Sequence, residues 1–251
     1  MPDLLNIKNL NKNFDGVTAL RNFSFEMNED EILGLIGPNG AGKTTFFNVL
    51  SGFIKPESGK MEFESEDITN SGSHKIVSKG ISRTFQDLRL IRQIPVIDNI
   101  LLSFNHNQGE NIYNIFFKQN FWKQVEEQDK KRAMELLEYA GIEEKAYDLA
   151  NDLSYGQQKL LSIICCLAAD AKLLLLDEPI AGLNPEMRTK ILNIISELPS
   201  KEKSAIIIEH DMDFVSDLCS KAIFMDMGEK ISEGTPEEVR NDPKVIETYL
   251  E

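Results

Sequence analysis

Residues 37–44 read Gly-Pro-Asn-Gly-Ala-Gly-Lys-Thr, the complete pattern G-x-x-x-x-G-K-[ST] of a phosphate-binding loop. Such a loop needs a strand before it and a helix after it. The apolar run Ile32–Ile36 supplies the strand, and the segment Lys43–Ser51 supplies the helix. A glycine-rich turn is the plainer alternative, but the flanking elements favour the phosphate-binding loop. This motif therefore restricts the chain to an α/β fold.

Each residue type of the loop suits the binding of phosphate groups. Glycines let backbone N–H groups turn inward, and the N-terminus of the following helix adds positive potential. Lys43 can reach the β- and γ-phosphates, and the Thr44 hydroxyl can ligate Mg²⁺. The predicted nucleotide contacts in the loop are Asn39, Gly40, Ala41, Gly42, Lys43, Thr44 and Thr45.

The rest of the chain divides by pattern into thirds. Short segments with strand character dominate the first third: Leu4–Leu10, Phe23–Met27, Ile32–Ile36 and Lys60–Glu64. In the last third, apolar runs alternate with amphipathic helical stretches, the pattern of a parallel sheet covered on both faces; the runs are Leu173–Leu176, Ala205–Ile208 and Ile223–Met225. Helix starts are marked by a capping residue before proline at Asn184, Thr235 and Asp242. Residues 87–158 between these parts are mostly helical, most clearly over Trp122–Ala140.

Acidic residues follow the apolar run at 173–176. Asp177 and Glu178 stand where an open parallel sheet binds its ligands, at the carboxyl end of a strand. If Asp177 faces the phosphate-binding loop, it can hold Mg²⁺ through water, while Glu178 polarises the water that attacks the γ-phosphate. His210 follows the run Ala205–Ile208 and would emerge at the same edge. Alone, the two carboxylates could be a charged surface and His210 an ordinary loop residue.

A third group of residues, Leu153-Ser154-Tyr155-Gly156-Gln157, precedes a helix predicted over Gln158–Ala169. Ser154 and Gln157 have the spacing of a capping box, so this helix also presents free N–H groups to an anion. Helix capping by itself would explain these residues. Their combination with the phosphate-binding loop and the acidic strand indicates more.

Together these motifs resemble the ATP-binding subunits of ABC transporters along essentially the whole chain. The resemblance implies an α/β P-loop (RecA-like) ATPase core with an N-terminal antiparallel β subdomain and an inserted α-helical subdomain. It implies one domain over residues 1–251, with 1–86 and 159–251 forming the core and 87–158 the insert that carries the signature. The activity implied is ATP hydrolysis with Mg²⁺.

The resemblance also assigns roles that residue patterns alone do not. Phe14 is expected to stack on adenine, with Val17 as a weaker contact, and Gln86 to sense Mg²⁺ and the attacking water. Thr44, Gln86 and Asp177 form the expected metal set, and Glu178, His210 and Gln86 the catalytic set. Two subunits pack head to tail in this family, so Ser154, Gly156 and Gln157 of one subunit are expected at the γ-phosphate held by the other. Residues 87–97 are expected to line the cleft that receives a transmembrane partner.

Two positions depart from the family pattern. The signature reads LSYGQ where the family has LSGGQ, and the loop after Glu178 ends in Asn184 where many members carry aspartate. Tyr155 leaves Ser154 and Gly156 in place, so we expect phosphate contact to persist. Asn184 changes the family pattern in a loop that the resemblance links to communication between the two ATP sites.

Within the family, several strings look most like importers of branched-chain amino acids. They are Arg83-Thr84-Phe85-Gln86, Ala181-Gly182-Leu183-Asn184-Pro185 and Glu209-His210-Asp211-Met212. None of these strings contacts a transported solute, so the solute rests on resemblance alone. Urea or amide importers and lipopolysaccharide exporters are the nearest alternatives.

Charge and length decide which partners to expect. The chain carries 27 Lys and Arg against 41 Asp and Glu, a net charge of −14, which disfavours nucleic acid and direct adsorption to an anionic membrane. The longest uncharged apolar run, Leu160–Ala169, is about half of the roughly 20 residues that a membrane span needs. No secretion signal opens the chain. We therefore expect a peripheral subunit on the cytoplasmic face of the cell membrane, held there by permease subunits.

The other expected partners are a second ATP-binding subunit, identical or related, and, indirectly, a substrate-binding protein. The competing class is a soluble ABC ATPase that works on DNA ends or ribosomes. Such relatives need long coiled coils or two cassettes, which 251 residues do not accommodate. A GTPase is disfavoured further, because the sequence contains no NKxD motif.

Aromatic residues gather within the insert. Tyr113, Phe117 and Phe121 share one face of an expected helix. This stripe is either internal packing or an apolar patch that docks against the permease.

Overall fold

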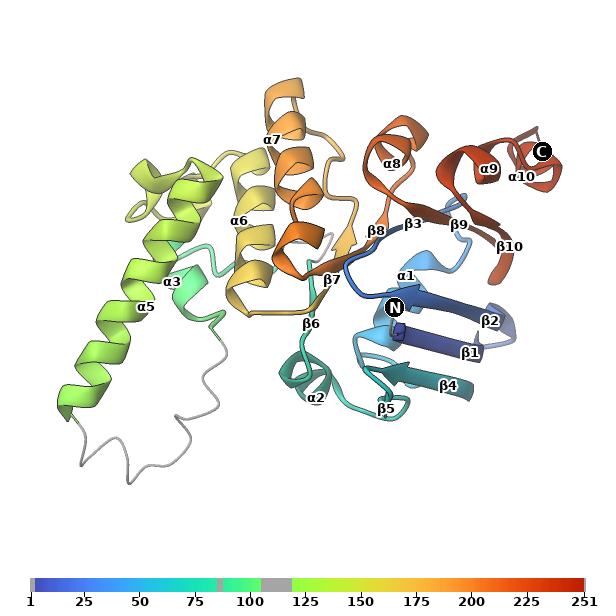
Figure 1. Ribbon diagram of the computed structural model, residues 1–251, viewed down its shortest axis with the longest axis horizontal. Coiled ribbons are helices and arrows are strands. Elements are labelled where there is room, and N and C mark those ends of the chain that lie inside the picture. The colour runs from blue at the N-terminus through green and yellow to red at the C-terminus, as the bar shows by residue number, and fades with distance from the viewer. Residues whose placement is uncertain (1–2, 85–87, 105–118, 251) are drawn as a thin grey trace. The chain divides into compact units, whose positions relative to one another are not determined.

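The computed structural model describes residues 3–84, 88–104 and 119–250. Contacts divide the chain into two compact units (Figure 1). Unit 1 comprises Met1–Gln86, Lys172–Ala181 and Leu192–Glu251, and unit 2 comprises Asp87–Ala171 and Gly182–Ile191. Unit 2 thus extends past residue 158, where the predicted insert ends.

The centre of unit 1 is a six-stranded sheet with the order β10-β9-β3-β8-β7-β6. All neighbouring pairs are parallel except β9 and β10. The three strands β3, β7 and β8 are buried along their whole length, as their apolar runs predict. The bounds are β3 Ile32–Ile36, β6 Ile81–Arg83, β7 Leu173–Asp177, β8 Ser204–Ile208, β9 Lys221–Asp226 and β10 Glu229–Gly234. The predicted α/β class is confirmed.

A second, antiparallel sheet of four strands has the order β2-β1-β4-β5. Its strands are β1 Asp3–Phe14, β2 Val17–Asn28, β4 Ser58–Phe63 and β5 Glu66–Asp67. β1 and β2 are longer than the predicted strands, because their polar outer stretches pair with each other through several register shifts. Asp15 and Gly16 join them in a tight turn with φ of 45° and 89°. This sheet is the predicted N-terminal β subdomain.

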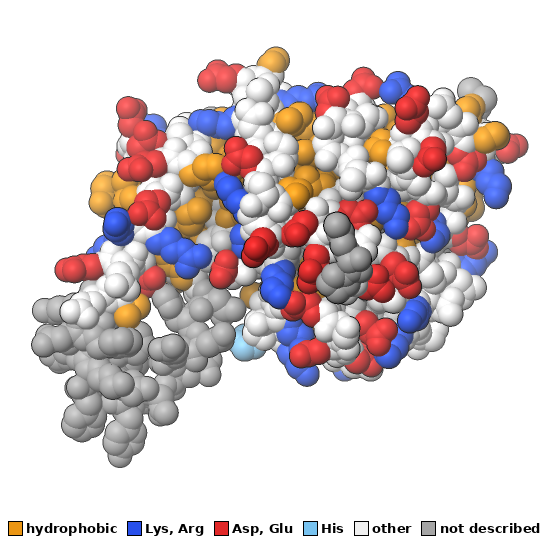
Figure 2. Space-filling view, in the orientation of Figure 1, with side chains coloured by type: hydrophobic (Ala, Val, Ile, Leu, Met, Phe, Trp, Pro, Cys, Tyr) orange, Lys and Arg blue, Asp and Glu red, His pale blue; other side chains and the backbone are white. Residues whose placement is uncertain are grey.

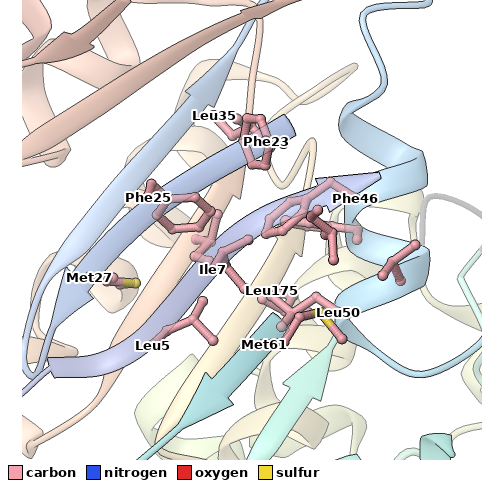
Figure 3. Close-up of a cluster of buried hydrophobic side chains, with 14 of the residues drawn as sticks. Leu5, Ile7, Phe23, Phe25, Met27, Leu35, Phe46, Leu50, Met61 and Leu175 are labelled. Atoms are coloured by element: carbon pink, nitrogen blue, oxygen red, sulfur yellow. The ribbon is translucent and has the colours of Figure 1, made fainter. Parts of the chain in front are cut away.

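One hydrophobic core joins the two sheets to helix α1, Lys43–Leu50 (Figure 3). The ring centroid of Phe46 on α1 lies 5.1 Å from that of Phe23 and 5.6 Å from that of Phe25, both on β2. Leu35 on β3 and Leu175 on β7 belong to the same cluster. Helix α1 is therefore fixed by packing on both sheets, and so is the loop that leads into it.

Four further α-helices of unit 1 are short: α2 Ser73–Ser78, α8 Met212–Leu218, α9 Pro236–Arg240 and α10 Pro243–Leu250; a 3₁₀ turn, η3, spans Pro199–Lys201. The capping signals predicted for two of them are present. Thr235 Oγ1 accepts from the Glu238 N–H, and Glu238 Oε2 accepts from the Thr235 N–H, which completes a capping box. Asp242 Oδ1 accepts from the Lys244 N–H at the start of α10.

Unit 2 is helical and is built on mutual contacts of α3 Val96–Leu101, α5 Gln119–Ala140 and α6 Tyr155–Ala168. It also holds the 3₁₀ turns η1 Glu143–Lys145 and η2 Ala150–Asp152 and the first part of α7 Pro185–Ser196. The predicted helix Trp122–Ala140 is present. The prediction that α6 begins at Gln158 is wrong, because Ser154 is the N-cap and the helix starts directly after it. The aromatic stripe lies outside the described residues, except that Phe121 falls within α5.

Charged side chains of both signs are interspersed over the face shown in Figure 2. Many form surface ion pairs, such as Lys130 with Glu126 at 2.7 Å. Within the described part of the chain, no helix has the length and apolar character to cross a bilayer.

Candidate nucleotide-binding site

The predicted phosphate-binding loop lies between β3 and α1, with its backbone pressed against neighbouring segments. A Cβ atom on Gly37, whose φ is 148°, would lie 1.9 Å from the carbonyl oxygen of Met225. A Cβ on Gly42, with φ of 103°, would lie 2.4 Å from the oxygen of Ala19. Only glycine fits these two positions, because both the space and the backbone angles exclude a side chain.

Lys43 begins α1 and turns back over the loop. Its ammonium donates to the carbonyl oxygens of Gly37 at 2.6 Å and Pro38 at 2.8 Å. Burial lowers the pKa of Lys43, and the carboxylates of Glu178 and Asp177 oppose that shift. The ammonium is thus a buried cation at the centre of the loop, already paired with oxygen acceptors.

A cavity of about 260 Å³ opens over the loop. It is lined by Val17, Thr18, Ala19, Asn39, Gly40, Ala41, Gly42, Lys43, Thr44, Thr45, Glu178, Ile208 and His210. All the loop residues predicted to bind nucleotide therefore face one space. Because Gly42 is the N-cap and has no side chain to accept from the first turn, the N–H groups of α1 are available to an anion.

The two residues expected at the adenine are placed differently. Val17 lines the cavity and its residue surface is 69% exposed. Phe14 is its register partner across the β1–β2 turn and is 41% exposed, but it is not among the lining residues. The Lys12 ammonium lies 5.1 Å from the Phe14 ring centroid. The hairpin holds an exposed aromatic ring next to a cavity-lining residue.

Asp177 ends β7 and is only 6% exposed. Its Oδ2 accepts from Nη2 of Arg83, on the neighbouring strand β6, at 3.1 Å. Burial raises the pKa of Asp177, and the hydrogen bond and charge of Arg83 oppose that shift. The sequence indicated a role for Asp177 but none for Arg83. The available signal was a basic residue shortly before Gln86, at the end of the short strand β6.

Glu178 follows at once and points differently because its backbone φ is 48°. Its N–H donates to the Ile208 carbonyl at 2.9 Å, so the loop after β7 is tied to the end of β8. Glu178 Oε1 lies 3.3 Å from Nε2 of His210. The predicted divergence of Asp177 and Glu178 is found: only Glu178 lines the cavity, where it meets His210.

Glu209 is a further residue of the site, which the sequence showed only as part of a family-like string and without a role. It is 3% exposed, and its Oε1 accepts from the Ile180 N–H at 3.1 Å while its Oε2 accepts from the His210 N–H at 3.3 Å. The carboxylate therefore joins the loop that carries Glu178 to the loop that carries His210. A lone acidic residue after four apolar strand positions was the only sequence signal.

The signature residues belong to unit 2. Ser154 Oγ accepts from the Gln157 N–H at 3.3 Å, and Gln157 Oε1 accepts from the Ser154 N–H at 2.9 Å, as the capping box predicts. A Cβ on Gly156 would lie 2.9 Å from Cγ of Met187 on α7. Tyr155 is 50% exposed at the helix start. Gln86 lies outside the described residues.

Asn184, the second departure from the family pattern, has a structural use. Its Oδ1 accepts from the Met187 N–H at 2.8 Å, which caps α7. Aspartate would cap in the same way, so the departure leaves the local fold unaltered.

A glycine loop between a buried parallel strand and a helix, with a lysine over it and an acidic strand end beside it, defines a P-loop nucleoside triphosphatase. Comparison with known proteins places the chain within that class. The family model for ABC transporters matches residues 20–181, and that for branched-chain amino acid ATP-binding cassette transporters matches residues 229–250.

Curated relatives match almost end to end. The high-affinity branched-chain amino acid transport ATP-binding protein LivG of Salmonella typhimurium is 38% identical over 98% of this chain and 97% of its own length. BraF of Pseudomonas aeruginosa, with the same description, is 35% identical over the same shares. A crystal structure of a nucleotide-free ATP-binding cassette from an ABC transporter covers 100% of both chains with a TM-score of 0.86 and 35% identity. The chain belongs to the ABC transporter family, as an ATP-binding cassette with ATPase activity.

Proposed function

We propose that this chain hydrolyses Mg²⁺-bound ATP to energise an importer of branched-chain amino acids. The observation that carries the hydrolytic part is the contact of Glu178 Oε1 with His210 Nε2 at 3.3 Å, in a cavity whose wall is the phosphate-binding loop. The amino-acid part is supported by the similarity to branched-chain amino acid transport ATP-binding proteins and by the match of the C-terminal residues to that transporter family.

Binding of ATP begins with an exchange of acceptors at Lys43. Its ammonium gives up the carbonyl oxygens of Gly37 and Pro38 for the β- and γ-phosphate oxygens. The N–H groups of the loop and of the first turn of α1 hold the remaining phosphate oxygens. The adenine lies toward Val17 and Phe14, at the β1–β2 turn.

The residues beside the loop suit Mg²⁺. The Thr44 hydroxyl and the Asp177 carboxylate, the latter through water, offer the oxygen ligands that this cation prefers. Gln86 is the third expected member of this set. Bound there, Mg²⁺ neutralises charge on the phosphate oxygens during transfer.

Glu178 is the general base in this proposal. It lines the cavity and is half-buried, so its carboxylate can accept a proton from a water molecule that attacks the γ-phosphate. His210 Nε2 contacts the carboxylate within the same cavity, and Glu209 accepts a hydrogen bond from the backbone N–H of His210. Gln86 is the other residue that the family resemblance leads us to propose for this water.

The signature acts on a second subunit. Ser154, Gly156 and Gln157 stand at the start of α6, a helix whose N–H groups and positive end suit a γ-phosphate. The chain therefore works as a head-to-tail pair, with itself or with a related ATP-binding subunit, and ATP closes the pair. The pair drives transmembrane permease subunits, which keep it at the cytoplasmic face of the cell membrane and receive solute from a substrate-binding protein. Nucleic acid has no part in this cycle.

The catalytic role is tested with Glu178→Gln. The variant should bind ATP as the wild type does while kcat falls by about 10² to 10⁴, the usual contribution of a general base. Glu247→Gln, an exposed glutamate of α10, is the matched control and should keep full activity. More than a tenth of wild-type kcat in Glu178→Gln would remove Glu178 from this role.

The transport role is tested with the same variant as bait. Tagged Glu178→Gln, held closed by ATP, is purified from detergent-solubilised membranes, and the co-purifying proteins are identified by mass. We expect multi-spanning permeases and a second ATP-binding subunit, and leucine uptake by the reconstituted wild-type complex. Uptake of urea or an amide, or export of lipopolysaccharide, would show that the transported solute is not a branched-chain amino acid. Recovery of soluble partners alone would overturn the transport assignment.

A further inference from the structure

Arg83 connects three segments around the expected metal site. It ends β6, and its side chain is only 6% exposed. Nη2 donates to Asp177 Oδ2 on β7 at 3.1 Å, while Nη1 donates to Asn48 Oδ1 at 2.8 Å and Ser51 Oγ at 3.2 Å at the end of α1. The guanidinium carbon lies 5.3 Å from the centroid of the Phe47 ring. The guanidinium is thus held in one orientation by the end of α1 and by β7, the strand next to its own.

We propose that Arg83 is a positioning residue for the Mg²⁺ site: by holding Oδ2 of Asp177 it fixes the carboxylate so that Oδ1 is presented to a metal-bound water. This inference rests on the proposed role of Asp177. Arg83 is not among the residues that line the nucleotide cavity, so it would act through the orientation of that carboxylate.

The contacts of Asp177 indicate why the arginine is needed. Asp177 is almost fully buried and is followed directly by a second carboxylate, Glu178. Lys43, the other nearby cation, is directed to the carbonyl oxygens of the loop. Arg83 is therefore the charge in direct contact with Asp177, and a buried carboxylate that loses its partner is strongly destabilised. Without Arg83, we expect the carboxylate to leave the position in which it serves the metal.

Two effects of removing Arg83 oppose each other. Loss of a positive charge next to Asp177 would by itself strengthen cation binding, whereas loss of the fixed carboxylate removes the acceptor that orients a metal-bound water. The positioning effect should be larger, because Asp177 is itself an outer partner of the metal, and loss of such a partner typically changes metal affinity by about 10- to 100-fold. The direction in which metal affinity changes therefore distinguishes the two roles. Weaker binding indicates a positioning residue, and stronger binding indicates only a neighbouring charge.

The test measures Mn²⁺ binding to the ADP complex by electron paramagnetic resonance, in full-length Arg83→Met and Arg83→Lys. Arg83→Met should bind Mn²⁺ at least about tenfold more weakly, and Arg83→Lys about threefold, since one ammonium cannot reach Asp177 and Asn48 together. ADP affinity without metal should stay within about twofold, because Arg83 does not contact the cavity. If Arg83→Met fails to fold, Arg83→Lys decides.

Arg240→Met is the matched control. Arg240 Nη1 lies 3.1 Å from Asp213 Oδ1, the same separation as in the Arg83 pair, but both side chains are exposed. Its Mn²⁺ binding should equal that of the wild type. In a double-mutant cycle, Arg83→Met should add nothing to the loss caused by Asp177→Asn, because Arg83 acts through Asp177.

Three results would count against these assignments. Unchanged or tighter Mn²⁺ binding in both Arg83 variants would overturn the inference while the metal site stands. Additive losses in the cycle would reduce Arg83 to a general structural residue and also overturn it. Absence of metal-coupled ADP binding in the wild-type chain would overturn the metal part of the proposed function, and this inference with it.

Discussion

Replacing Glu209 with alanine should destabilise the chain and impair catalysis together. The carboxylate accepts hydrogen bonds from the Ile180 N–H at 3.1 Å and from the His210 N–H at 3.3 Å. Ile180 is only 6% exposed, whereas His210 is exposed. The buried N–H loses a charge-assisted bond worth about 1.5–3 kcal/mol, and the exposed one, which water can serve, about 0.5–1 kcal/mol. We therefore expect the free energy of unfolding to fall by about 2–4 kcal/mol.

Urea denaturation at fixed pH measures this loss, with Glu247→Ala as a control whose stability should change by less than about 0.5 kcal/mol. Glu209→Gln should lie between alanine and the wild type, because its carbonyl oxygen can still accept the Ile180 N–H while its NH₂ group faces a donor. Steady-state assays should show a lower kcat in Glu209→Ala, since His210 loses its anchor. A Glu209→Ala chain as stable as the control would refute the assignment of the two hydrogen bonds.

Other predictions test single features of the site. Lys43→Ala should weaken ATP binding, measured by equilibrium dialysis, because no other side chain in the loop supplies a cation; unchanged affinity would contradict its placement. Ser154→Ala removes the cap of α6 and should cost about 1 kcal/mol in chemical denaturation, while ATP binding to the monomer persists and ATP-driven dimerisation, followed by light scattering, is lost. Burial would raise the pKa of Glu233, but hydrogen bonds from two lysines bring it below its usual value. The ionised Glu233 therefore stabilises the fold at pH values above the ordinary glutamate pKa, and this stabilisation is lost as the pH falls through the lowered pKa. Thermal melts of Glu233→Gln should lack this loss of stability at acidic pH. A variant whose melting temperature falls with pH as the wild type's does would refute this prediction.

Local patterns predicted the parts of this molecule that local physics determines. The loop at 37–44, the buried strand before Asp177 and the capping boxes at Ser154 and Thr235 all depend on residues within a few positions of one another. The polar outer stretches of β1 and β2 were not predicted as strand, because their structure comes from pairing with each other and not from apolar alternation.

Local patterns could not predict contacts between segments that are distant in the sequence. Arg83 and Asp177 are 94 positions apart, and Glu209 and Ile180 are 29 apart. Each pair meets only because parallel strands bring their carboxyl ends to one edge of the sheet. The sequence could indicate which edge would carry the chemistry, but not which second residue would hold each catalytic one in place.

The close approach of Gly37 to Met225 shows that one residue of the phosphate-binding loop is required by the fold, whereas Lys43 is required by ATP binding. Because any side chain at position 37 would collide with the backbone of β9, a chain with this sheet would keep that glycine even after losing its ability to bind ATP. Lys43 has no such steric necessity. In relatives that no longer bind ATP, Gly37 would therefore be retained because the sheet requires it. Loss of the lysine would be the better sequence marker of a pseudoenzyme.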